Sequence, residues 1–94
     1  MELKVPLKCP SCESILKVQK LKCESCGTEV AGLYSLPLLA RLEPKDQQFI
    51  TEFVKSSGSL KVMAQNMGLS YPTVRNLLDS IIEQIRLSEK QNLL

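Results

Sequence analysis

The sequence predicts an α+β fold, in which a small cysteine-bearing β-hairpin domain precedes a domain of three helices. Three observations predict it. All four cysteines lie within the first 26 of the 94 residues, apolar and polar residues alternate over most of residues 14–22, and apolar residues recur with a helical period after residue 43. The alternation is typical of strands, and the later period is typical of amphipathic helices.

The composition is that of an ordinary globular protein and argues against an enzyme. Hydrophobic residues make up 44% of the chain and charged residues 23%, which indicates neither disorder nor a membrane span. The N-terminal residues lack the hydrophobic segment of a secretory signal, so we expect a cytoplasmic protein. The chain has no histidine, which removes the usual general base near neutral pH. We therefore expect a non-enzymatic binding protein without a membrane partner or a small-molecule substrate.

The cysteines form two pairs, Cys9 with Cys12 and Cys23 with Cys26, and two residues separate the members of each pair. This spacing lets a tight turn aim two thiolates at one point, and two such turns facing each other complete a tetrahedral zinc site. Disulfides are the alternative, and they fit poorly in a chain without an export signal. We expect one zinc ion with a structural role, because sulfur fills all four positions. Iron bound by four thiolates stays open.

The residue that follows each cysteine pair differs between the two turns. Gly27 follows the second pair, and Glu13 follows the first. The residue at this place often adopts a left-handed conformation, which glycine enters without penalty. A non-glycine residue there carries a strain of about 1–2 kcal/mol. We therefore expect the first turn to be slightly looser than the second.

The chain divides into four predicted segments. Residues 1–34 form a zinc ribbon. A segment of about 30 residues cannot fold on hydrophobic contacts alone, so we expect the bound metal to stabilise it. Residues 35–42 form a short connecting helix. Residues 43–88 form a helix-turn-helix domain, and residues 89–94 form a frayed tail.

Helix boundaries follow from capping residues. Pro44 suits the first turn of the first helix, and Gly58 is expected to end that helix. Ser59 is placed to cap the second helix and Gly68 to end it. Ser70 is placed to cap the third helix.

The turn between the second and third helices is short and contains a glycine, which is typical of a helix-turn-helix. It comprises residues 67–70, in which Leu69 is expected to plug the gap between the two helices. The alternative is a three-helix bundle with a purely structural role. The periodicity of apolar residues does not distinguish this bundle from a helix-turn-helix. The buried side of the third helix is predicted to consist of Val74, Leu77, Leu78, Ile81, Ile82 and Ile85.

A stretch without acidic residues coincides with this turn. Residues 53–78 contain no Asp or Glu but include Lys55, Lys61 and Arg75, in a chain with a formal net charge of only +2. On the third helix the later outward positions are acidic, beginning with Asp79. Because phosphates repel acidic side chains, we expect only the N-terminal end of this helix to approach duplex DNA, as recognition helices commonly do.

Two residues early in the third helix are the main candidates for contacts with bases. Asn76 suits a bidentate contact with adenine, and Arg75 suits guanine or a phosphate. The other candidates for DNA contact carry a hydroxyl or a cation near a helix N-terminus, where phosphate binds well; they are Ser59, Lys61, Ser70, Tyr71 and Thr73. Capping alone is the competing explanation for the two serines, and packing against the third helix is the competing explanation for Tyr71.

Three parts of the sequence resemble a known family: the two cysteine pairs, the run Ala40-Arg41-Leu42, and the run from Gly68 to Arg75. The chain resembles a family of small prokaryotic proteins that join an N-terminal four-cysteine zinc ribbon to a C-terminal helix-turn-helix. The helical part is also similar to the promoter-reading region of sigma factors. The resemblance implies metal binding and suggests DNA binding. Glu13 and Glu43 depart from it, since glycine and serine are common there.

These observations favour a zinc-stabilised DNA-binding protein that regulates transcription. The alternative is a protein-interaction adaptor, which binds RNA polymerase or a partner regulator without contacting DNA. A homodimer stays open, because the long third helix carries more apolar residues than its own small core needs.

Overall fold

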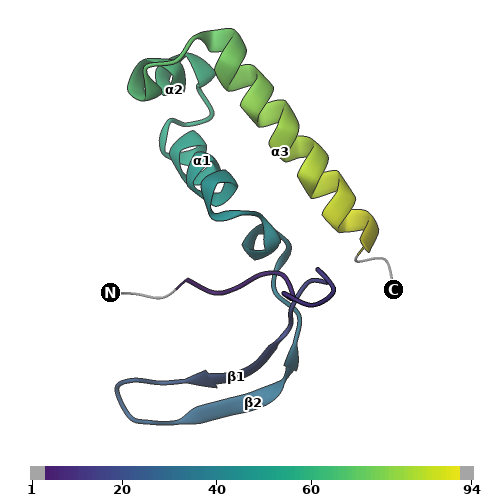
Figure 1. Ribbon diagram of the computed structural model, residues 1–94. Helices are drawn as coiled ribbons and strands as arrows, with labels where there is room; N and C mark the ends of the chain where they lie inside the picture. The colour runs from purple at the N-terminus through teal and green to yellow at the C-terminus, as the bar shows by residue number, and fades with distance from the viewer. Residues whose placement is uncertain (1–3, 92–94) are drawn as a thin grey trace. The chain divides into compact units, whose positions relative to one another are not determined.

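The computed structural model describes residues 4–91 and divides into two compact units, with the boundary between Pro37 and Leu38. The first unit contains a two-stranded sheet, and the second contains a short 3-10 helix followed by three α-helices (Figure 1). This arrangement confirms the predicted α+β class and the order of the two parts.

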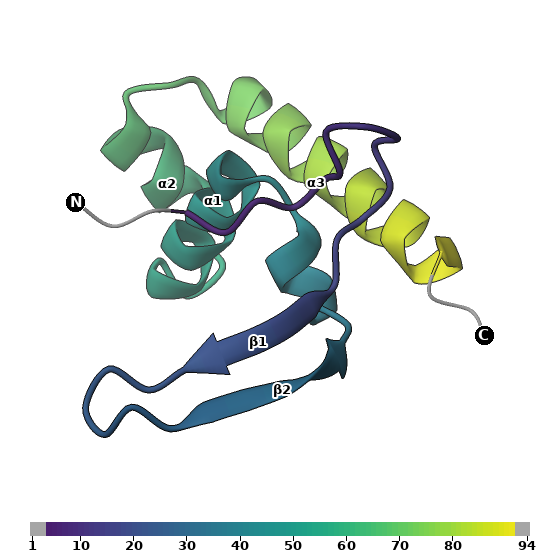
Figure 2. The ribbon, with the colours of Figure 1, turned by 60° about the horizontal axis from the view of Figure 1, so that its bottom comes forward.

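The first unit is built on an antiparallel hairpin. Strands β1 (Val18–Lys22) and β2 (Glu29–Tyr34) run antiparallel (Figure 2). Leu21 pairs with Val30, and the register shifts near the start of β1. An isolated bridge between Lys8 and Ile15 closes the chain segment before β1. Of the alternating residues 14–22, from which a strand was predicted, the second half forms β1.

The hairpin unit shows no hydrophobic core among residues 4–37, none of which is buried. Leu21, Val30 and Leu33 keep 56%, 49% and 72% of their surface exposed. So small a segment cannot bury enough apolar surface to fold unaided. Its stability therefore has to come from a source other than packing.

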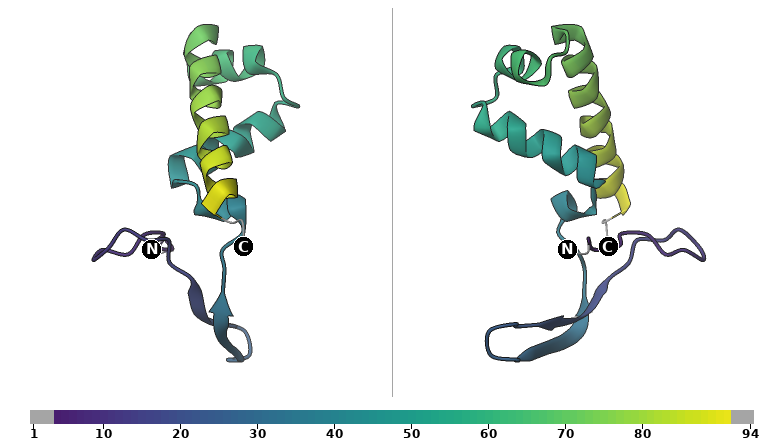
Figure 3. Two further views of the ribbon diagram at one scale, coloured as in Figure 1. Left: turned by 90° about the vertical axis from the view of Figure 1, so that its right-hand side faces the viewer. Right: turned by 60° about the vertical axis from the view of Figure 1, so that its left-hand side comes forward.

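The second unit holds the core of the protein. It consists of η1 (Leu38–Arg41), α1 (Pro44–Lys55), α2 (Leu60–Met67) and α3 (Tyr71–Gln91) (Figure 3). Apolar residues at helical spacing bring one face of each α-helix inward. The buried residues of this core are Leu42, Phe49, Leu60, Met63, Ala64, Val74 and Ile81.

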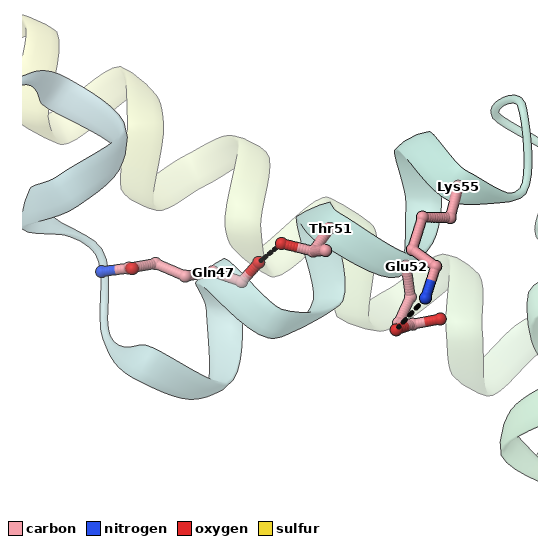
Figure 4. Close-up of polar contacts among 4 residues, drawn as sticks. All are labelled: Gln47, Thr51, Glu52 and Lys55. Carbon is pink, nitrogen blue, oxygen red and sulfur yellow. Dashed lines mark hydrogen bonds and ion pairs between the residues drawn. The ribbon is translucent and has the colours of Figure 1, made fainter. Parts of the chain in front are cut away.

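The segment predicted to connect the two domains belongs in part to the helical unit. Leu42 is a member of the core and is only 4% exposed. The side chain of Gln47 extends from the start of α1 (Figure 4). It donates hydrogen bonds to the carbonyl oxygens of Ala40 at 3.3 Å and of Leu42 at 2.7 Å. Because these bonds fix the end of η1 against α1, residues 38–42 are part of the helical unit and not a free linker.

The third helix is longer than predicted. It continues through Gln91, so residues 89–91 are helical where a frayed tail was expected. Residues 92–94 of that tail lie outside the described residues. The segment carries no glycine or proline that would end the helix, and Lys90 stands in the last turn, where a cation interacts favourably with the helix dipole.

Both ends of α2 follow the sequence prediction. Ser59 Oγ accepts a hydrogen bond from the Val62 N–H at 3.1 Å. Gly68 adopts a left-handed φ of 67°, and the following Leu69 N–H donates to the Ala64 carbonyl oxygen at 3.0 Å. This pair of features is the Schellman ending of a helix.

The end of α1 differs from the prediction. Ser57, with a φ of 55°, and Gly58, with a φ of 80°, are both left-handed, so a left-handed serine precedes the glycine that was expected to end the helix. The Gly58 N–H donates to the Phe53 carbonyl oxygen at 2.9 Å. At the other end of α1, Glu43 is the N-cap and its side chain makes no capping hydrogen bond.

Candidate metal and nucleic-acid sites

The two cysteine turns have the same backbone hydrogen bonds. In the first, the Cys9 N–H donates to the Ser14 carbonyl oxygen at 2.8 Å, and the Glu13 N–H donates to the Cys9 carbonyl oxygen at 2.8 Å. In the second, Cys23 and Gly27 make the equivalent bonds, also at 2.8 Å. The sequence spacing therefore produces two equivalent turns.

The residue after each pair is left-handed, as expected. Glu13 has a φ of 63° and Gly27 a φ of 79°. The expected loosening of the first turn is not observed, because its backbone bonds are as short as those of the second. These bonds hold Glu13 in place, and the strain of a left-handed non-glycine residue stays in the turn.

Hydroxyl groups next to the turns favour the thiolate form of two cysteines. Cys12 Sγ lies 3.3 Å from Ser14 Oγ, and Cys26 Sγ lies 3.0 Å from Thr28 Oγ1. Hydrogen bonding to these hydroxyls lowers the pKa of Cys12 and Cys26, with smaller contributions from the neighbouring backbone and from the other cysteine of each pair. Because the thiolate is the form that binds metal, each turn is a suitable pair of ligands.

The structure brings the thiols together as two pairs and not as one group of four. Within residues 4–91, no three Cys, Asp, Glu or His side chains gather into a group that could hold a metal ion. Figure 3 shows the first turn, on the purple segment, away from the hairpin tip that carries the second. The predicted convergence is therefore not seen, and all four cysteines are free. Each turn fits half of a tetrahedral zinc site.

Metal binding, rather than packing, is the interaction expected to hold the two turns together. Thiol groups do not attract one another, and the described part of the hairpin unit has no buried side chain that would pull the turns together. In small metal-binding domains the free energy of ligand binding supplies that force. The assignment of all four cysteines to one ion stays a prediction.

The hydroxyl candidates near the helix N-termini are engaged within the protein. Ser70 Oγ accepts a hydrogen bond from the Thr73 N–H at 3.3 Å, and the two hydroxyl oxygens lie 2.8 Å apart. Ser59 caps α2 in the same manner. Capping therefore accounts for both serines, whereas no contact in the structure separates a DNA role from a packing role for Tyr71, which is 52% exposed.

Two of the three cations in the acid-free stretch are paired with carboxylates just outside it. Arg75 Nε lies 3.5 Å from Asp79 Oδ1, and Lys55 Nζ lies 3.6 Å from Glu52 Oε1 (Figure 4). Lys61 is exposed and makes no ion pair with the described residues. The positive charge available to a partner is therefore smaller than the sequence count indicates.

The structure agrees only in part with the predictions for the side chains around the turn. Leu69 was expected to fill the gap between the two helices, but its side chain is 41% exposed. Its backbone N–H instead closes the Schellman turn. Asn76 is exposed, as predicted. The pairing of Arg75 with Asp79 was missed, although opposite charges four residues apart on a helix are a readable signal.

Family models match both the cysteine-bearing part and the helical part of the chain. Residues 42–88 match a family model described as "Domain of unknown function (DUF2089)-HTH". Residues 9–40 match a model described as "DUF2089 zinc ribbon". No curated protein and no solved structure matches the chain. The similarity to sigma factors stays a prediction. No helix within the described range is long and apolar enough to cross a membrane.

Proposed function

Because the chain belongs to the DUF2089 family, which joins a zinc ribbon to a helix-turn-helix, we propose that it is a zinc-stabilised DNA-binding regulator of transcription. It reads duplex DNA with the N-terminal end of α3, has no enzymatic activity and works in the cytoplasm. One observation carries the proposal. The acid-free residues 53–78 include all of α2, the turn and the start of α3, where phosphates would lie closest.

The proposal includes one structural zinc ion bound by Cys9, Cys12, Cys23 and Cys26. The support is the family match together with the two equivalent thiol turns. When bound, zinc would supply the bonds that hold the two turns to each other. Structural zinc contributes folding free energy on the order of 10 kcal/mol or more in small domains, which is more than this coreless hairpin obtains from packing.

The proposed DNA contacts differ in kind. Asn76 and Arg75 contact base edges, and Lys61 contacts a phosphate. Phosphates also meet the N-termini of α2 and α3, where backbone N–H groups point outward. The residues proposed to line those two N-termini are Ser59, Ser70, Tyr71 and Thr73.

The test is a pair of substitutions at the start of α3. Arg75→Ala and Asn76→Ala each remove a base contact and are expected to weaken binding to a selected duplex by about 1–3 kcal/mol. Fluorescence anisotropy on a labelled duplex, selected from a random-sequence pool by the zinc-loaded protein, measures the change. Arg86→Ala is the matched control, since it removes an exposed arginine more than two turns further along α3. The proposal is wrong if the protein binds no duplex at low salt, or if neither substitution weakens binding.

A protein-interaction adaptor is the second candidate. Val62, Leu69 and Tyr71 are 40%, 41% and 52% exposed, and such side chains suit a protein partner better than a phosphate backbone. The partner would be RNA polymerase or a partner regulator. Recovery of a stoichiometric protein partner after nuclease treatment, by a protein that does not bind duplex DNA, would favour this candidate.

A further inference from the structure

The ion pair between Arg75 and Asp79 occupies the part of α3 proposed to face DNA. Arg75 is the fifth residue of α3, and its Nε lies 3.5 Å from Asp79 Oδ1. The two side chains are 54% and 53% exposed, so both remain accessible to a partner. The carboxylate engages the Nε side of the guanidinium.

The pair contributes little to helix stability. The order of a basic residue followed four residues later by an acidic one is the less favourable of the two orders. Half-exposed pairs also contribute little, because solvent screens them. The pair therefore calls for an explanation in terms of function.

We propose that Asp79 is a specificity-determining residue that holds Arg75 as a reader of guanine. With Nε engaged, the two terminal amino groups of Arg75 remain free, and these can reach the O6 and N7 acceptors of guanine. A guanidinium held in place loses less conformational freedom on binding a base. The inference rests on the proposed DNA-binding function.

The same carboxylate weakens contacts that carry no sequence information. Affinity for the phosphate backbone grows with each cation that neutralises a phosphate. Asp79 partly neutralises Arg75 and itself repels phosphates. It therefore lowers affinity for random duplex while it raises the preference for a site with guanine at one position.

The test compares Asp79→Asn with Glu83→Gln. Both remove one negative charge from the exposed side of α3, but Glu83 makes no ion pair with any described residue, so only Asp79→Asn breaks an ion pair and weakens the hold on Arg75. Each variant, with zinc bound, is assayed on a random-sequence duplex and on the duplex selected by the unchanged protein. Asp79→Asn is expected to bind random duplex more tightly than the unchanged protein, and to lose about fivefold or more of its preference for the selected site. Glu83→Gln is expected to keep that preference.

A combined variant shows whether Asp79 acts through Arg75. In an Arg75→Ala background, Asp79→Asn is expected to leave the preference unchanged. Equal preferences for Asp79→Asn, Glu83→Gln and the unchanged protein would overturn the inference while leaving DNA binding intact. A protein that binds no duplex and enriches no sequence would instead overturn the proposed function, and the inference with it.

Discussion

Replacing Cys23 with serine will abolish stoichiometric zinc binding and leave the hairpin unit without stable structure. The described residues of that unit include no buried side chain, so no packing compensates for a lost ligand. A site with three thiolates and a hydroxyl binds zinc far more weakly than one with four thiolates. The helical unit will stay folded, because all buried core residues in the described part of the chain lie in it.

Elemental analysis of freshly purified, reduced protein measures the metal, and hydrogen exchange measures the structure of residues 4–37. Ser25→Ala is the matched control, since it alters the same turn without removing a thiol. One zinc per chain is expected for the unchanged protein and for this control. Absence of stoichiometric metal from the unchanged protein, or full retention of zinc by the Cys23 variant, would contradict the assignment. Iron at the same stoichiometry would keep the ligands and correct the metal.

Replacing Met63 with alanine will destabilise the helical unit by about 2–5 kcal/mol, the range for large-to-small changes in a core. Met63 is only 1% exposed and is one of the two largest fully buried side chains. A unit this small has little stability to spare. A large share of the protein is therefore expected to lose the helical fold and with it the ability to bind DNA.

Urea unfolding followed by circular dichroism measures the loss. Val62→Ala is the matched control, because the neighbouring Val62 is 40% exposed and its truncation leaves no cavity. Zinc content is expected to stay at one ion per chain in both variants, since all four proposed ligands belong to the hairpin unit. A change below about 1 kcal/mol for Met63→Ala would show that the core is not packed as described.

Features with local causes were predictable from the sequence. A capping serine acts on an N–H three residues away, so the caps of α2 and α3 followed from Ser59 and Ser70 alone. The form of each cysteine turn is equally local, since two backbone bonds and one left-handed residue define it. The family match then confirmed that the two parts occur together in this order.

Features set by contacts between distant segments were not predictable. Leu42 lies in an apolar run with no clear period, and only its packing in the core places it in the helical unit. The convergence of the cysteine turns depends on a force that the hairpin itself does not supply. The free positive charge of the acid-free stretch was overestimated for a different, local reason. The partners of Lys55 and Arg75 lie only three and four residues away on the same helix, just beyond the stretch.

The central claim, that this chain binds duplex DNA through the start of its helix-turn-helix, is tested most directly by a salt titration. The affinity of the zinc-loaded protein for duplex DNA is measured at increasing salt concentration. The logarithm of the association constant should fall against the logarithm of salt concentration, with a slope per monomer between about −0.9, if Lys61 alone neutralises a phosphate, and about −2.7, if all three cations do. A dimer would double these values. Absence of binding at the lowest salt concentration, or an affinity that does not change with salt, would contradict the claim.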